Sequence, residues 1–342
     1  MTDESPGWQA IDAALVRVYG ETDPLHYAPQ VPAMLGGNDF LEGVSVYRSR
    51  FGGRPHWHYV TYGFTELHEK ESEDEAVSGF GFEMTIRVID PEQDGDEPPK
   101  WPISLLQNLA RYVFSSGNAF GPGHKTTLNG PIARGRDTRL TAAAFRLDPE
   151  LPAMDTPHGH VEFLELVGLT EDEYSASKDW DTHAMLELFA ERDPALVSDL
   201  ARPSWLDDPE IARRVAEGTA RDGSSMDLFF ATRGSFDASA SPPVLGIGAN
   251  ALDDLRRLMR GRLALGKEGT IIWPDGMLSL VPGEETSVGD GVLSLDGADQ
   301  RVIAELPTRR GDYPLPSGRA LVRVIPVDIL DGERKKVVDT IG

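Results

Sequence analysis

The spacing of apolar residues predicts a sheet with helices packed on it in the first third of the chain. Apolar residues recur at helical intervals over residues 6–19, which predicts an amphipathic helix. A second such helix is expected at 102–114, where Pro102 suits the first helical position. Between them the alternation of apolar and polar positions predicts strands at 44–51, 57–64 and 80–89.

The middle of the chain continues this pattern and then changes character. Strands are expected at 139–147 and 161–168, and short helices follow them. Met226 to Thr232 is an apolar run typical of a strand, whereas residues 234–243 have the Ser, Ala and Pro content of a linker. The sequence therefore predicts a first domain over residues 5–233, a linker at 234–243 and a smaller second domain over 244–334.

The second domain is expected to be strand-rich. One amphipathic helix opens it and carries the only positive cluster of note, which consists of Arg256, Arg257, Arg260 and Arg262. Short strands separated by Gly, Pro and Asp turns are then expected near 270–273, 277–281, 291–295, 301–306 and 319–330. Together the two patterns predict an α+β protein with a mixed sheet in its first domain.

Composition narrows the possible functions. With 56 acidic and 33 basic residues the formal charge is −23, which disfavours direct binding to nucleic acid or to anionic lipid. No stretch approaches the roughly 18 apolar residues that span a bilayer, and Met1 to Gly7 lacks the features of a secretion signal, so a cytoplasmic location is expected. The lack of cysteine excludes disulfides, iron–sulfur clusters and thiol nucleophiles.

Two histidine pairs raise the question of a metal site. His56 and His58 share one face of a predicted strand, and His158 and His160 form a second pair. Four imidazoles, with Asp155 or Glu162 adding a carboxylate, would suit zinc, iron or nickel. However, this spacing arises by chance on strands, and we expect the rings to bond to backbone or water instead. We assign no metal ligand and no cofactor, and we keep a metal-dependent enzyme as the alternative function.

Motifs of catalysis are missing from the sequence. It contains no nucleophile elbow, P-loop or dinucleotide fingerprint, and Ser78-Gly79-Phe80-Gly81 has two glycines that open a strand rather than a helix. We therefore assign no catalytic residue and expect a protein that is not an enzyme.

Five blocks of sequence, in one order, resemble the suppressor of fused family. The resemblance continues through Phe163 to Gly168 and covers roughly residues 5–232. It implies an α+β domain and a binding protein; the animal member is a cytoplasmic negative regulator of Hedgehog signalling that binds Gli transcription factors. The blocks are Pro6 to Ile11, Met34 to Arg48, His56 to Gly63, Ser78 to Glu83 and Trp101 to Phe114.

The resemblance also implies how a partner is held. In the family a short peptide strand lies between the two domains and adds to an exposed sheet edge. The groove tyrosine corresponds to Tyr112, and the edge strand corresponds to Met226 to Thr232, with Leu228 and Phe230. The aspartate that meets the animal ligand falls at or beside His124, so we expect this chain to bind a different peptide.

Beyond residue 232 the resemblance is weaker and points to a compact form of the family. The chain lacks the long insertion of the animal protein, as do bacterial members linked with toxin–immunity loci. The leading hypothesis is a binding protein whose partner is a toxin or a regulatory protein, held in the cleft between two domains. A structural or oligomerising domain is a third possibility.

Overall fold

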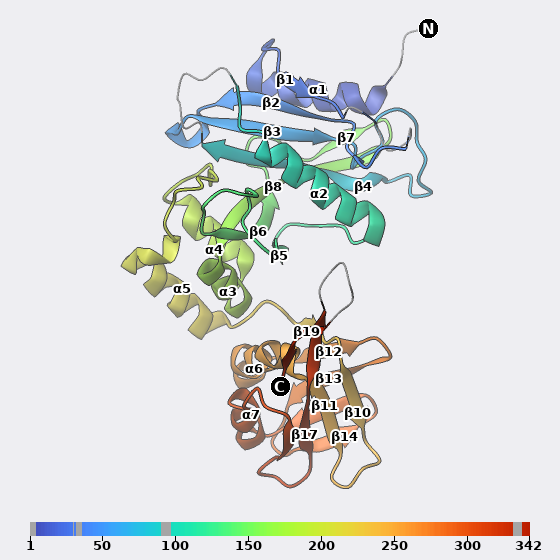
Figure 1. The fold of residues 1–342 in the computed structure, drawn as a ribbon, viewed down its shortest axis with the longest axis vertical. Helices are drawn as coiled ribbons and strands as arrows, with labels where there is room; N and C mark the ends of the chain where they lie inside the picture. The colour runs from blue at the N-terminus through green and yellow to red at the C-terminus, as the bar shows by residue number, and fades with distance from the viewer. Residues whose placement is uncertain (1–4, 30, 32–35, 90–96, 331–336) are drawn as a thin grey trace. The chain divides into compact units, whose positions relative to one another are not determined.

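The chain forms two compact units. The computed structural model describes all residues except 1–4, 30, 32–35, 90–96 and 331–336. The N-terminal unit contains residues 1–175 and 182–212, and the C-terminal unit contains 176–181 and 213–342 (Figure 1). The domain limits predicted from the sequence, at residues 233 and 334, stay predictions, and residue 334 lies outside the described residues.

A large mixed sheet forms the centre of the N-terminal unit. Its strands lie in the order β1-β2-β3-β4-β8-β6-β5, with β7 paired to β8. The β4–β8 pair is parallel and the other pairs are antiparallel, which confirms the predicted mixed sheet. The strands are β1 (Leu25–Tyr27), β2 (Gly43–Ser49), β3 (His56–Tyr62), β4 (Val77–Ile89), β5 (Lys125–Thr127), β6 (Leu140–Leu147), β7 (Met154–Thr156) and β8 (Gly159–Thr170).

Two helices pack against different sides of this sheet (Figure 1). Helix α1 (Pro6–Tyr19) buries Ile11 and Leu15 in a cluster with Tyr47 and Val60. Helix α2 (Trp101–Ser116) buries its apolar side in a separate cluster that includes Val46 and Tyr59. Because neighbouring strand residues point to opposite faces, Val46 and Tyr47 serve different cores. Both predicted helices are confirmed.

Three further helices follow β8, namely α3 (Glu171–Asp179), α4 (Thr182–Ala190) and α5 (Pro209–Asp222). Glu173 accepts the Thr170 N–H at 2.9 Å, so this carboxylate satisfies one of the free donors at the start of α3. Gly218 of α5 lies against Trp180, and a Cβ atom there would come within 2.2 Å of the indole. Any larger residue at position 218 would displace that ring.

The C-terminal unit has one core bounded by two sheets and two helices, α6 (Leu252–Gly261) and α7 (Gly297–Ala304). The four-stranded sheet has the order β10-β11-β17-β16, with bounds Gly234–Asp237, Val244–Gly248, Leu321–Ile325 and Gly311–Pro314. The five-stranded sheet has the order β14-β15-β13-β12-β9, with bounds Ser287–Gly289, Val292–Leu295, Gly276–Pro282, Gly269–Trp273 and Leu228–Phe230. A hairpin of β18 (Val327–Leu330) and β19 (Val337–Ile341) ends the chain.

Two local predictions differ from the structure. Residues 234–237, within the predicted linker, form strand β10, because Phe236 packs against the core and the strand pairs with β11. The strand expected at 301–306 is wrong, because those residues belong mainly to helix α7. Asp296 caps that helix by accepting the N–H groups of Ala298 and Asp299, which outweighs the β-branched pair Val302-Ile303.

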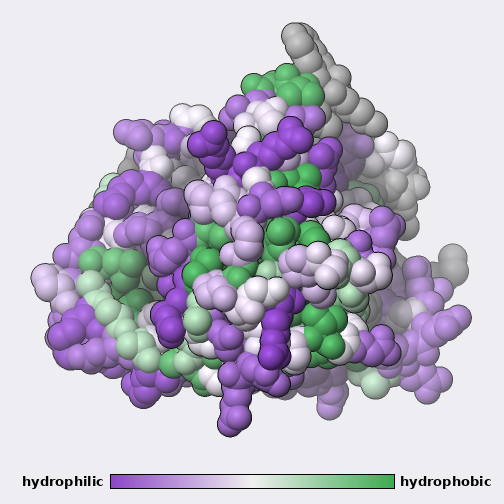
Figure 2. All heavy atoms as spheres, turned by 90° about the horizontal axis from the view of Figure 1, so that it is seen from below, coloured by the Kyte–Doolittle hydropathy of each residue, from purple (hydrophilic) through white to green (hydrophobic). Residues whose placement is uncertain are grey.

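On the face shown in Figure 2, hydrophilic residues surround separate groups of hydrophobic ones. Within the described part of the chain, no helix has the length and apolar character needed to cross a bilayer.

Candidate partner-binding surface

A groove runs along α2 in the N-terminal unit. It has a volume of about 1200 Å³ and lies between α2 and residues 126–134, which include the end of β5 and the loop after it. Its walls combine apolar side chains with several charged ones. They include Asp39, Lys100, Trp101, Ile103, Leu109, Arg111, Tyr112, Phe120, Leu128, Ile132 and Arg134. We call it the α2 groove.

Tyr112, predicted as a partner-binding residue, lines the α2 groove. Its side chain is 47% exposed, which is high for a large aromatic residue. The ring lies 5.7 Å from that of Phe120, which stacks in turn on buried Phe145 at 4.4 Å. The exposed tyrosine is therefore held in place from below and presents a rigid surface to a ligand.

His124 lies at the start of the sheet edge formed by β5. Phe145 donates its N–H to the His124 carbonyl at 2.9 Å, and Leu128 donates to Thr141 at 2.9 Å. Backbone groups alternate along a strand, so those of Lys125 and Thr127 point away from β6. The imidazole of His124 is exposed and does not line the α2 groove, although Tyr112 does.

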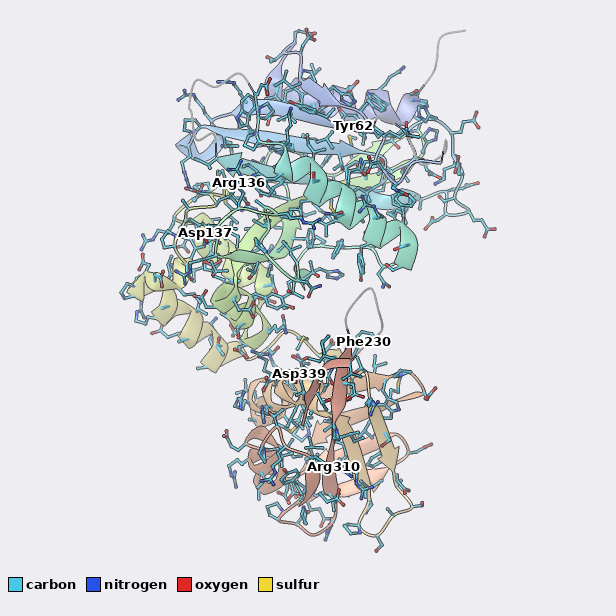
Figure 3. The ribbon with its side chains drawn as sticks, viewed as in Figure 1. Tyr62, Arg136, Asp137, Phe230, Arg310 and Asp339 are labelled. Carbon is cyan, nitrogen blue, oxygen red and sulfur yellow. The ribbon has the colours of Figure 1, made fainter. Side chains whose placement is uncertain are left out.

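The predicted edge strand is β9, and it lies at the end of the five-stranded sheet. Thr270 donates its N–H to the Asp227 carbonyl at 2.8 Å, and Ala231 donates to Ile272 at 2.8 Å. By alternation, the backbone groups of Leu228 and Phe230 point away from β12. Their side chains are 39% and 71% exposed, whereas Phe229 between them is buried. Phe230 is labelled in Figure 3.

An apolar strip extends from β9 across the neighbouring strands. Phe230 lies opposite Ile272, and Ile272 lies opposite Met277, so all three side chains share one face of the sheet. Met277 is 64% exposed. Sequence inspection did not identify Met277 as part of this strip, because Phe230 and Ile272 lie 42 positions apart along the chain and no local motif connects them.

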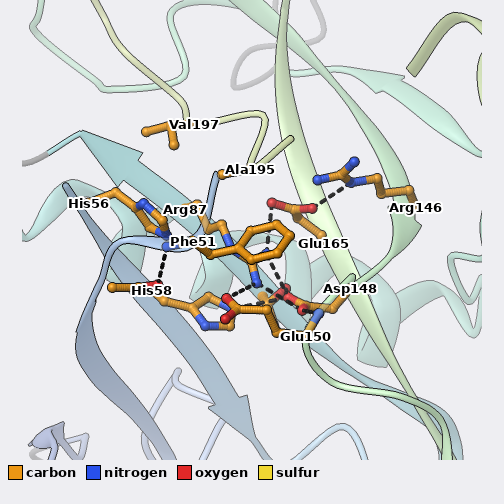
Figure 4. A network of polar contacts seen from close by, with 12 residues as sticks. Phe51, His56, His58, Arg87, Arg146, Asp148, Glu150, Glu165, Ala195 and Val197 are labelled. Atoms are coloured by element: carbon orange, nitrogen blue, oxygen red, sulfur yellow. Dashed lines mark hydrogen bonds and ion pairs between the residues drawn. The ribbon is translucent and has the colours of Figure 1, made fainter. Parts of the chain in front are cut away.

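The histidines of the first pair are buried in a polar network on β3 (Figure 4). His58 is fully buried; its Nε2 donates to Asp148 at 3.1 Å, and its Nδ1 accepts the Tyr19 hydroxyl at 2.6 Å. His56 donates from Nδ1 to the Arg54 carbonyl at 2.7 Å. Burial lowers the pKa of His56 to about 4. Tyr19, His58 and Asp148 form a chain of hydrogen bonds. His58 and Asp148 are buried, so a substrate cannot reach them.

Charges in this network compensate one another. Arg87 is fully buried and contacts Asp148, Glu150 and Glu165 at 2.8 to 2.9 Å, and Arg146 also pairs with Glu165. Burial by itself would raise the pKa of Asp148, but His58 and Arg87 outweigh it and hold this pKa well below its usual range. Such pairing serves the fold, because a charge left alone at this depth would be costly.

The second histidine pair also has protein partners. His158 bonds through Nε2 to the His68 carbonyl at 3.2 Å, and His160 bonds through Nδ1 to Asp155 at 3.0 Å. Among the residues that the structure describes, no group of three or more His, Asp or Glu side chains could hold a metal ion. The geometry therefore gives the alternative of a metal-dependent enzyme no support.

Known proteins match both the sequence and the fold. The model of one family, Suppressor of fused protein (SUFU), matches residues 37–203. The human and mouse suppressor of fused homologs are each 34% identical over 256 residues, which cover 69% of this chain and 52% of the relative. The chain thus spans about half the length of these curated relatives.

Solved structures agree with this result. Drosophila Suppressor of Fused shares the fold, with a TM-score of 0.78 at 20% identity over 94% of this chain and 97% of that chain. A chain of the Sufu–Fu complex matches with a TM-score of 0.58 at 29% identity, over 62% of this chain and 97% of that chain. This chain belongs to the suppressor of fused family.

Proposed function

We propose that this chain is a non-enzymatic binding protein that holds an extended segment of a partner protein by strand addition at β9. The observation that carries the proposal is an edge strand whose outward backbone groups belong to Leu228 and Phe230, two residues that also expose apolar side chains. Proteins usually protect such an edge with charge, proline or a covering segment, because it templates unwanted pairing. An edge left apolar is expected to have a partner.

Backbone hydrogen bonds and side-chain contacts both stabilise binding of the proposed partner segment. Each added ladder bond contributes about 1 kcal/mol, and the strip of Phe230, Ile272 and Met277 offers apolar area beside the new strand. A related chain has been solved in the Sufu–Fu complex, which supports a protein as the partner. We further propose that the partner contacts Tyr112 and His124, and that His124 directs binding away from the peptide of the animal family.

Variants at Phe230 separate the backbone contribution from that of the ring. Phe230→Ala removes the ring but keeps the N–H, whereas Phe230→Pro removes both. Because this N–H points away from β12, proline is expected to leave the sheet intact. Val338→Ala, at another exposed apolar strand residue of the same unit, is the matched control.

The measurement is quantitative co-purification of partners from the native host. Recovery is expected to fall with Phe230→Ala, to fall further with Phe230→Pro, and to match wild type with Val338→Ala. Equal recovery with all three variants, from preparations with the same melting temperature, would show that β9 is not the binding edge.

We also propose that this protein acts in the cytoplasm and that its partner is a toxin or a regulatory protein. The support is its resemblance to compact members linked with immunity loci. A toxin-like reading frame beside the gene should kill cells when expressed alone and spare them when this chain is co-expressed. Killing that is unaffected by the chain would contradict the immunity role and leave strand addition open.

A further inference from the structure

The negative charge of the protein is concentrated in one part of the sequence. Residues 1–212 contain 37 acidic and 16 basic residues, a net charge of −21, whereas residues 213–342 contain 19 and 17, a net charge of −2. In the first part, carboxylates outnumber basic side chains more than twofold. Because acidic residues are so abundant in this part, a basic side chain without an acidic partner is a candidate contact for an acidic group of a ligand.

Two such arginines lie on the loop after β5. Arg134 and Arg136 are exposed, and neither side chain has a partner among the residues that the structure describes. Figure 3 labels Arg136 beside Asp137. Arg134 lines the α2 groove, and so does Lys100 at the start of α2.

The other charges of the groove are mostly engaged. Arg111 pairs with Asp39 at 3.6 Å and also bonds to the Asn38 carbonyl, so this pair is close to neutral. Among the described residues, the acidic partner of Lys100 is Glu97 at 4.0 Å, and the side chains of both are largely exposed. Lys100 and Arg134 thus remain available, on one groove, to groups that come from outside.

We propose that the α2 groove binds an extended acidic segment of the partner protein. Its carboxylates pair with Lys100 and Arg134, and its apolar side chains pack on Tyr112 and Phe120. The inference rests on the proposed function and adds the chemistry of the segment that the N-terminal unit receives. The surrounding charge of −21 favours a short peptide over nucleic acid, because it repels a long polyanion.

The length of the groove agrees with a short segment. From Lys100 to Tyr112 helix α2 rises about 18 Å, at 1.5 Å per residue. An extended peptide rises about 3.3 Å per residue, so about five or six residues fill this distance. Two carboxylates in such a segment suffice to match the two available basic residues.

The test uses a display library of random dodecapeptides selected on the whole 342-residue chain. Selected peptides are expected to be enriched in Asp and Glu next to apolar residues. The double variant Lys100→Gln with Arg134→Gln is expected to bind them at least about tenfold more weakly. The double variant Arg17→Gln with Arg50→Gln changes the net charge equally, at exposed arginines outside the groove, and is expected to bind like wild type.

Several outcomes would contradict binding of an acidic segment in the α2 groove. A library that yields no binder, peptides without excess acid, or equal binding by both double variants would overturn it. A single-stranded oligonucleotide that displaces the peptides at lower concentration would overturn it in favour of nucleic acid. Binding that is lost with Phe230→Pro and retained with the groove variant would overturn the acidic segment while leaving strand addition in place.

Discussion

At the scale of single residues, burial changes the meaning of polar side chains that the sequence leaves ambiguous. Arg87 alternates with apolar residues along β4, as a solvent-facing residue would, yet it is fully buried. Its partner Asp148 lies 61 positions away, and only the fold brings the two together. His56 and His58 were correctly placed on one strand, but their partners could not be predicted, because hydrogen bonds between distant segments leave no local pattern.

Arg87→Met tests the cost of breaking this buried network. The substitution leaves Asp148 and Glu165 without their main cation, so the free energy of unfolding is expected to fall by about 3–5 kcal/mol. Urea denaturation at pH 7 measures the change. Arg50→Met, at an exposed arginine, should change stability by less than about 0.5 kcal/mol. A loss below about 1 kcal/mol for Arg87→Met would contradict the assigned role.

The lowered pKa of His56 predicts how the stability of the folded protein depends on pH. Burial is the main cause that lowers its pKa from 6.5 to about 4, and the charge of Arg87 adds to it. The unfolded chain therefore takes up a proton below pH 6.5 while the folded chain does not, so stability falls as the pH drops from 6.5 towards 4. By pH 5 the contribution amounts to about 2 kcal/mol.

His56→Asn removes this titration and keeps a donor near the position of Nδ1. Between pH 7.5 and pH 5, wild type is expected to lose about 2 kcal/mol more than the variant in denaturant unfolding. Parallel pH profiles for the two proteins would show that His56 is not the titrating group.

At the scale of elements, predictions succeeded where a long segment has one consistent period. Helices α1 and α2 and strands β2, β3, β4, β6 and β8 were all expected from apolar spacing. Short elements failed where local signals conflict, as in α7, where a strand was predicted at 301–306 although Asp296 caps a helix that begins at Gly297. Within the positive cluster noted in the sequence, Arg256 and Arg260 bond to the carbonyls of Leu306 and Ala304.

Some residues of the candidate site could be identified from the sequence, and others could not. Phe230 and Tyr112 were identified through the family resemblance, and the structure places both side chains at the surface. Arg134 and Met277 were missed, because their importance comes from a groove and a strip that only tertiary structure creates.

Asp296→Ala tests the cap that determines α7. Removing the carboxylate leaves the N–H groups of Ala298 and Asp299 without their acceptor, so stability is expected to fall by about 1 kcal/mol. Asp290→Ala, at an exposed aspartate of the same unit, is the control for loss of charge. Equal denaturation midpoints for the two variants would mean that α7 forms without help from the cap.

At the scale of the whole molecule, the chain contributes to the C-terminal unit twice. Residues 176–181 belong to it together with 213–342, so one cut cannot separate the two units. Trp180 accounts for this arrangement: its indole donates to Asp222 at 3.0 Å and packs on Gly218. A fragment cut after residue 233, the boundary predicted from sequence, would keep these contacts of Trp180. It would, however, leave strand β9 without its pairing partner β12.

Two fragments test the importance of this short segment. A fragment that ends at residue 224 retains the α5 contacts of Trp180, whereas one that ends at residue 212 removes them. The shorter fragment is expected to emit tryptophan fluorescence at longer wavelength and to be less stable by about 3 kcal/mol, since a large buried ring loses its packing. Trp180→Phe in both fragments should abolish the difference in emission, because the fragments contain the same other tryptophans. If both fragments emitted at the same wavelength, Trp180 would be held by residues before 213, and the segment 176–181 would belong with the N-terminal unit.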